Sequence, residues 1–156
     1  MLQPGDIILV HSHSLIGKLI RWTTKAWANH VAVYLGNNEV LEAKPGGVAK
    51  GSYDQYLQEG YEVRVYRFQV SDEFIQEFIR SVLEKTGRKY DFGQIGGLLL
   101  ICLFHIDLKD QNSHLTICSE LIYESAQDVG IPVPAIPKYK FMPKDIENWS
   151  ILKQVN

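Results

Sequence analysis

The sequence predicts a fold that combines antiparallel strands with amphipathic helices, and three segments carry this prediction. Residues 30–43 alternate apolar and polar side chains on both sides of the turn sequence Gly36-Asn37-Asn38, which is typical of a β-hairpin. Residues 71–87 and 118–129 instead place their apolar side chains at helical spacing. Two different hydrophobic periods in one chain therefore indicate both strands and helices.

The remaining elements follow from shorter signals of the same kind. Short runs rich in β-branched residues predict strands, glycine clusters predict loops, and the prolines after residue 131 argue against regular helix. In chain order we expect a strand over 6–10, a helix over 14–23, a loop over 44–51, a short helical turn over 53–57, a strand over 62–68, a helix over 91–106, and a tail of strand and turn over 138–156.

Length and composition narrow the classes of protein. A chain of 156 residues, 46% hydrophobic and 22% charged, is expected to fold as one globular domain over residues 1–156. A formal net charge of −2 makes nucleic acid an unsuitable partner. The apolar run 95–104 is about half of the ~20 residues that a membrane-spanning helix needs. Oligomeric state is not encoded in any pattern that we recognise.

The start of the sequence and its cysteines suggest a compartment. The first residues lack a basic stretch followed by an apolar segment and a cleavage site, so we expect a cytoplasmic protein. In that reducing environment Cys102 and Cys118 are expected to be free thiols.

Cys118 is the first candidate for chemistry, because it stands where a helix is predicted to begin. Unpaired backbone N–H groups and the positive end of the helix dipole stabilise a thiolate at such a position. A free cysteine is also a common small buried side chain, so position alone leaves both interpretations open.

The hairpin supplies a candidate base and a candidate acid. With Gly36-Asn37-Asn38 as a three-residue loop, Leu35 opposes Glu39 and Ala32 opposes Glu42. This register places Glu42 diagonally beside His30, on the face opposite the predicted core. Glu42 could then orient the imidazole of His30, which could take the proton of Cys118. The alternative is an exposed hairpin with a surface histidine and glutamate.

Three further residues are candidates for substrate binding or oxyanion stabilisation. Tyr34 lies on the same face of the predicted strand as His30, although a half-buried strand tyrosine is the commoner explanation. The backbone N–H of Ser119 or Cys118 could contribute to an oxyanion hole. His13 could line the cleft.

A zinc-stabilised domain is the competing interpretation. Cys102, His105, His114 and Cys118 have a spacing that superficially suits zinc. Cys102 lies among leucines and isoleucines, however, without the polar neighbours that orient metal ligands. His11 and His13 are also two apart but do not require a metal. We therefore expect no metal site and no cofactor.

In their order along the chain these motifs resemble the YiiX/YebB-like permuted papain-fold amidases, a branch of the NlpC superfamily related to the lecithin retinol acyltransferase-like proteins. The resemblance covers nearly the whole chain. It rests on Gly5-Asp6-Ile7-Ile8-Leu9, Trp22-Thr23, His30-Val31-Ala32-Val33-Tyr34-Leu35-Gly36, Val40-Leu41-Glu42-Ala43, Tyr66-Arg67, Tyr90-Asp91-Phe92, Cys118-Ser119-Glu120-Leu121-Ile122-Tyr123 and Pro143-Lys144-Asp145-Ile146.

The resemblance implies an α+β, circularly permuted papain-like (NlpC-type) fold, in which a small antiparallel sheet or barrel packs against the helix that carries the nucleophile. It also implies that Cys118 is the nucleophile, His30 the base and Glu42 the orienting acid. The implied activity is hydrolysis of an amide or ester bond through a thioester acyl-enzyme. The implied substrate is a small peptide such as a cell-wall peptide, another amide or an acyl lipid.

Three alternatives remain beside this hydrolase: an acyltransferase of the same fold, a non-catalytic binding module and the zinc-stabilised domain. Residues 96–104 could contact an acyl chain or a membrane surface, but we favour a buried core segment.

Overall fold

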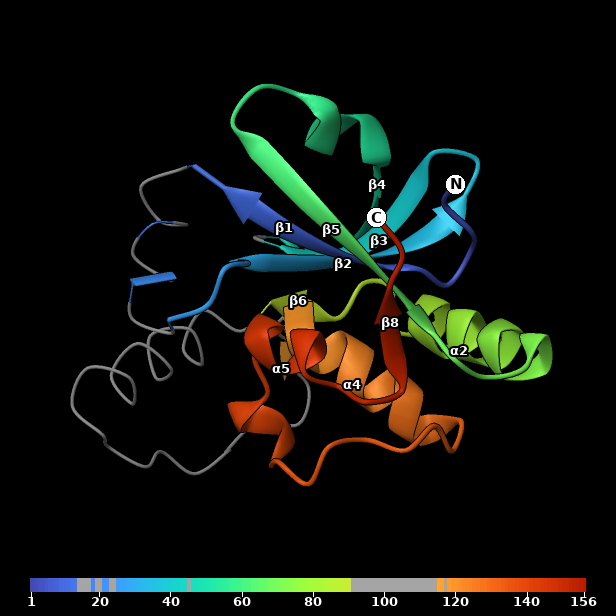
Figure 1. Cartoon of the computed structure of the whole chain (residues 1–156). Coiled ribbons are helices and arrows are strands. Elements are labelled where there is room, and N and C mark those ends of the chain that lie inside the picture. The colour runs from blue at the N-terminus through green and yellow to red at the C-terminus, as the bar shows by residue number, and fades with distance from the viewer. Residues whose placement is uncertain (14–17, 19–20, 23–24, 45, 91–114, 117) are drawn as a thin grey trace.

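A six-stranded open antiparallel sheet forms the centre of the protein (Figure 1). The structure, a computed structural model, describes residues 1–13, 18, 21–22, 25–44, 46–90, 115–116 and 118–156. The strands follow the order β4-β3-β2-β1-β5-β8 across the sheet. Their bounds are β1 Ile7–Ser12, β2 His30–Gly36, β3 Glu39–Lys44, β4 Gly47–Ser52, β5 Tyr61–Phe68 and β8 Leu152–Gln154.

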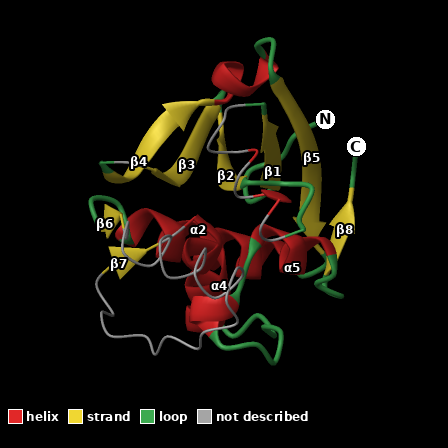
Figure 2. Ribbon diagram, turned by 90° about the vertical axis from the view of Figure 1, so that its left-hand side faces the viewer, coloured by secondary structure: helices red, strands yellow, loops and turns green. Residues whose placement is uncertain are grey.

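Helices cover one face of this sheet, and a short helical turn covers the other (Figure 2). The two longer helices, α2 (Asp72–Glu84) and α4 (Cys118–Asp128), pack against each other beneath the sheet. The 3-10 helix η1 (Tyr53–Leu57) lies on the opposite side. The smaller elements are the parallel pair β6 (Lys89–Tyr90) and β7 (Leu115–Thr116), the 3-10 helix η2 (Lys138–Lys140) and α5 (Pro143–Glu147).

Both faces of the sheet are buried, which explains why the strands are so apolar. The larger core lies between the sheet and α2 and α4, and it includes Cys118. The smaller core joins Ile8, Val10, Ala32, Val40 and Tyr56 on the η1 side. This smaller core lies on the face opposite Val31 and Val33, where η1 covers the sheet.

The predicted hairpin between β2 and β3 is present, but its turn differs from the prediction. Asn37 and Asn38 both have positive φ (49° and 65°), as a two-residue turn between paired strands requires. Gly36 rather than Leu35 opposes Glu39, and a β-bulge between Tyr34 and Gly36 absorbs the extra residue. Ala32 therefore still opposes Glu42, as predicted.

Two other predictions need correction. The expected loop over 44–51 is largely the edge strand β4, because the glycines there permit close backbone approach instead of ending the strand. The tail contains a helix that begins at Pro143, since proline is tolerated at the first helical position. Asp145 accepts a hydrogen bond from the Met142 backbone N–H (2.8 Å) and so caps this helix.

The other predicted elements within the described residues are confirmed: the strands near 6–10 and 62–68, the turn over 53–57 and the helices after Ser71 and at Cys118. Most of the predicted helix over 14–23, and the predicted helix over 91–106 with its apolar run, fall outside the described residues. Among the residues that are described, no helix has the length and apolar character needed to cross a membrane.

Candidate active site

Cys118, the candidate nucleophile, stands at the beginning of α4. Cys118 is a free cysteine, 7% exposed, in the first position of the helix. The helix packs against β2 and β3, which carry the other two candidate residues. Backbone N–H groups in a first helical turn have no intrahelical partner, so they are available to a group bound beside Cys118.

The histidine and the glutamate come from the neighbouring strands of the hairpin. Nε2 of His30, at the start of β2, lies 2.8 Å from Oε2 of Glu42 on β3. His30 also has a side-chain hydrogen bond with Cys118. Because Nε2 is directed to Glu42, Nδ1 is the ring nitrogen left for the sulfur. The structure thus links Cys118, His30 and Glu42 in one chain of contacts.

Burial and charge act in opposite directions on the imidazole. Burial alone lowers the pKa of His30, but hydrogen bonds to Cys118 and Glu42, together with their negative charges, raise this pKa to about 9. The side chain of Glu42 is only 3% exposed. Burial raises the pKa of Glu42. The hydrogen bond and charge of His30 outweigh this effect, together with the hydrogen bonds of Tyr56 and Lys44, so the pKa lies below its ordinary value. An imidazolium beside a carboxylate is the favoured state at neutral pH.

Glu42 has three further hydrogen-bond donors that the sequence analysis missed. Lys44 Nζ and Gln55 Nε2 donate to Oε1 at 2.9 and 3.0 Å, and the Tyr56 hydroxyl donates to Oε2 at 2.5 Å. Burial and the adjacent charge of Glu42 raise the pKa of Tyr56, so this hydroxyl remains a neutral donor. With both carboxylate oxygens occupied, Glu42 can present only one orientation to His30.

Gly51 on β4 makes room for this carboxylate. A Cβ atom at residue 51 would lie 2.6 Å from Oε1 of Glu42 and 3.0 Å from Nε2 of Gln55. These separations are shorter than van der Waals contact allows, so a larger residue would displace the glutamate. Alternation along β3 could have identified Lys44 as a neighbour of Glu42. The contacts of Gln55, Tyr56 and Gly51 with Glu42 depend on how β4 and η1 fold back over the sheet.

Tyr34 and Ser119 lie in the same elements as the site but engage other groups. The Tyr34 hydroxyl accepts a hydrogen bond from the backbone N–H of Asn38 (3.2 Å), at the turn end of β2. Tyr34 is four positions along β2 from His30, a distance of about 13 Å. The Ser119 hydroxyl donates to the backbone carbonyl of Phe141 at 2.6 Å, so its side chain joins α4 to the C-terminal segment.

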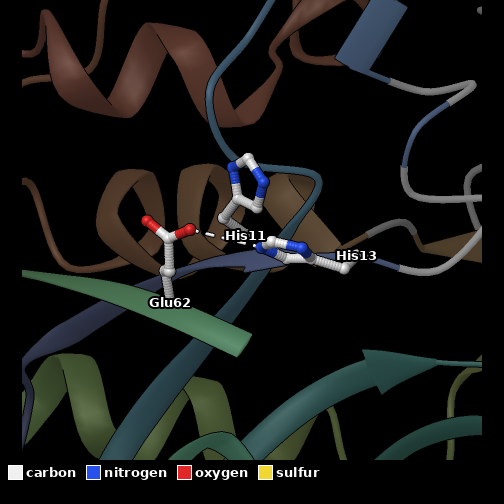
Figure 3. A group of neighbouring side chains, drawn as sticks. All are labelled: His11, His13 and Glu62. Carbon is white, nitrogen blue, oxygen red and sulfur yellow. Dashed lines mark hydrogen bonds and ion pairs between the residues drawn. The ribbon is translucent and has the colours of Figure 1, made fainter. Parts of the chain in front are cut away.

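His13 follows β1 directly and belongs to a second polar cluster, at the end of that strand. Its Nε2 lies 3.2 Å from Oε1 of Glu62, and His11 stands beside it with ring centroids 5.0 Å apart (Figure 3). One ligand atom from each of His11, His13 and Glu62 lies within 4.8 Å of the others, so this group could hold a metal ion. Burial, followed by the charge of Arg21, lowers the pKa of His11.

Of the four residues in the competing zinc interpretation, only Cys118 is among the described residues. Cys102, His105 and His114 lie outside them. Cys118 itself is in contact with His30, which was not one of the four.

The whole chain is similar to proteins of known structure and family. The crystal structure of the metalloprotein yiiX from Escherichia coli O157:H7 superposes with a TM-score of 0.74 and 20% sequence identity, covering 99% of this chain and 96% of that one. This likeness confirms the predicted α+β fold. No curated protein matches the sequence. Residues 1–148 match the family described as permuted papain-like amidase enzymes of the YaeF/YiiX type, C92. Because that match covers nearly the whole chain, the protein belongs to the permuted papain-like amidases, a family of cysteine hydrolases.

Proposed function

We propose that the protein hydrolyses an amide bond of a small acyl substrate through a thioester on Cys118. His30 serves as general base and general acid, and Glu42 orients His30 and stabilises its protonated form. The single observation that carries this proposal is the chain of contacts from Cys118 to His30 and from His30 to Glu42, the latter at 2.8 Å. The amidase family supports the amide bond as the target.

The electrostatics of the site support a nucleophile that is ready before substrate binds. The pKa of about 9 for His30 keeps the ring protonated at neutral pH. An imidazolium beside the cysteine, at the N-terminal end of a helix, stabilises the thiolate form of the sulfur. A thiolate is the nucleophilic form of a cysteine.

The reaction then proceeds in two steps. In the first, the Cys118 sulfur attacks the carbonyl carbon and the C–N bond breaks, while the His30 imidazolium gives its proton to the departing amine. In the second, neutral His30 takes a proton from water, the resulting hydroxide attacks the thioester, and the C–S bond breaks. The products are a carboxylic acid and the original Cys118–His30 pair.

The negative oxygen formed in each step needs hydrogen-bond donors. We assign the backbone N–H groups of Cys118 and Ser119, because they stand in the first turn of α4 where no intrahelical acceptor exists. The Ser119 side chain is occupied by Phe141, so only its main chain can take part.

The substrate is proposed as a small peptide, another amide or an acyl lipid with an amide link. An ester would pass through the same thioester, and an acyltransferase would differ only in the nucleophile that resolves it. Addition of a primary amine or alcohol acceptor during turnover separates the two activities, since a hydrolase continues to release free acid while a transferase forms the acylated acceptor.

The first experiment measures the pH dependence of Cys118 alkylation by iodoacetamide, followed by intact mass and peptide mapping. The parent protein should label rapidly well below pH 8, and His30→Ala should lose this reactivity. Cys118→Ala should abolish turnover of any amide that the parent cleaves while the circular dichroism spectrum is retained. An ordinary thiol profile in both parent and His30→Ala would overturn the proposal, as would full turnover by Cys118→Ala.

A further inference from the structure

A second cluster of side chains lies outside the Cys118–His30–Glu42 site and has no part in the reaction above. We propose that His11, His13 and Glu62 form a binding site for a divalent transition-metal ion of the zinc type. Two histidine nitrogens and one carboxylate oxygen are a ligand set that such ions accept, with at least one coordination position left open. This inference does not depend on the proposed amidase chemistry.

The register of β1 and β5 places the three side chains on one face of the sheet. His11 is the direct cross-strand partner of Glu62. His13 follows two residues later, and its backbone N–H donates to the carbonyl of Gly60 at 3.0 Å, which continues the extended pairing. Side chains two apart on a strand point to the same side. The two imidazoles and the carboxylate therefore converge, as Figure 3 shows.

The three ligand atoms lie close enough together to bind the same metal ion. One ligand atom from each residue lies within 4.8 Å of the others. His13 Nε2 and Glu62 Oε1 are already 3.2 Å apart. Two ligands of a tetrahedral zinc ion are separated by about 3.3 Å, given zinc–ligand bonds of about 2.1 Å. Small rotations of the His11 and His13 side chains would thus complete a three-ligand set.

The state of the His11 ring nitrogen Nδ1 is an independent observation that points to a ligand. Nδ1 of His11 is buried and has no hydrogen-bond partner among the residues that the structure describes. A histidine binds a metal ion through a ring nitrogen that carries no proton, and Nδ1 of His11 is available for that role. A buried polar atom without a partner carries a free-energy cost that a bound cation would remove.

The positive charge of Arg21 acts on the cluster and opposes a cation. Arg21 acts on His11 electrostatically, but its guanidinium is held by the Ser12 backbone carbonyl and by Oδ1 of Asn29. The carboxylate of Glu62 supplies the compensating negative charge inside the cluster. His13 and Glu62 are 53% and 60% exposed, so an ion can enter from solvent.

The site is also close to the candidate active site. Val10, the residue before His11, is the cross-strand partner of His30. A zinc ion added to the protein could therefore bind Cys118 and His30 instead. The test must remove that competing site, so it uses untagged full-length Cys118→Ser protein.

The test titrates this protein with Zn²⁺ by calorimetry and with Co²⁺ by visible absorption. We expect one ion per chain, with affinity falling at least about tenfold in His13→Ala and in Glu62→Gln. Glu39→Gln is the matched control, because Glu39 is a similarly exposed carboxylate (50%) paired with Lys50 at 2.9 Å on the distant β3–β4 hairpin. Its affinity should not change.

Two outcomes would overturn the proposal. One is the absence of Zn²⁺ and Co²⁺ binding to the Cys118→Ser protein at micromolar concentrations. The other is equally tight binding by His13→Ala and Glu62→Gln, which would place the ion elsewhere in the chain. Both substitutions are at exposed positions, and thermal unfolding followed by circular dichroism verifies that the variants are folded.

Discussion

Nε2 of His30 and Oε2 of Glu42 are 2.8 Å apart, although the residues come from different strands and are separated by a turn. The pairing register of β2 and β3 brings these two side chains into contact. Glu42 is 3% exposed and is contacted by three other donors, so it behaves as a fixed carboxylate rather than a mobile surface group. The properties of His30 should therefore depend strongly on Glu42.

The first prediction concerns the charge of that carboxylate. Glu42→Gln keeps the side-chain shape but removes the negative charge that favours imidazolium, so the pKa of His30 should fall from about 9 toward its ordinary 6.5. NMR titration of labelled histidine measures this pKa directly. The rate of Cys118 alkylation near neutral pH should fall with it, and turnover should drop by about 10²-fold, less than in Cys118→Ala. An unchanged His30 titration would show that Glu42 does not tune the ring.

The second prediction concerns stability against pH. His30 has a folded-state pKa of about 9, above the ordinary 6.5, so its stabilising contribution is complete below about pH 6.5 and is lost as pH rises through about 9. A pKa shift of this size corresponds to about 3 kcal/mol. The difference in unfolding free energy between the parent protein and His30→Gln should accordingly be largest near pH 6 and shrink toward pH 10. Urea unfolding at intervals across this range measures it, and a difference that grows with pH would contradict the assignment.

The register of the site could be predicted from local sequence because burial and alternation agree in β2 and β3. Ala32 opposes Glu42 as expected, although the turn has two residues and a bulge near Leu35 supplies the third. The hydrophobic pattern specifies which side chains face α4, and any turn that preserved this pattern had to bring Glu42 to the His30 side. The prediction of the turn type was wrong, whereas the predicted pairing of Ala32 with Glu42 was correct.

What could not be predicted depends on segments that fold back from elsewhere in the chain. Tyr56 and Gln55 reach Glu42 only because η1 lies over the sheet, and no local period encodes that placement. Gly51 was interpreted as part of a loop, since glycine in a strand and glycine in a turn look alike in sequence. That the 1–156 chain is a single domain, and that Cys118, His30 and Glu42 have the roles proposed, remain predictions.

The third prediction separates the hydroxyl of Tyr56 from its ring. Tyr56→Phe removes the donor 2.5 Å from Glu42 and should lower the unfolding free energy by about 1–3 kcal/mol, because the buried carboxylate loses a charge-assisted hydrogen bond. Tyr34→Phe is the control, since its hydroxyl accepts only a backbone N–H at the exposed hairpin turn. Chemical denaturation at pH 7 compares the two variants. Equal losses of stability would show that the Tyr56 hydroxyl has no special part in holding Glu42.

The fourth prediction tests whether space beside Glu42 matters as much as its hydrogen bonds. Gly51→Ala would bring a Cβ atom to 2.6 Å from Oε1 of Glu42, so either the carboxylate rotates away from His30 or β4 moves outward. Both responses weaken the interaction of Glu42 with His30. Turnover and the His30 pKa should therefore fall, as in Glu42→Gln.

Lys50→Ala is the neighbouring control on β4, because Lys50 is an exposed residue whose ammonium contacts Glu39 instead. It should leave both measurements unchanged. If Gly51→Ala lowered only the unfolding free energy while turnover and the His30 titration stayed as in the parent, β4 would support the sheet without shaping the site. If turnover and the titration shifted together in Gly51→Ala and not in Lys50→Ala, the absence of a side chain at residue 51 would be a requirement of the His30–Glu42 pair, because a Cβ atom at residue 51 would lie 2.6 Å from Oε1 of Glu42.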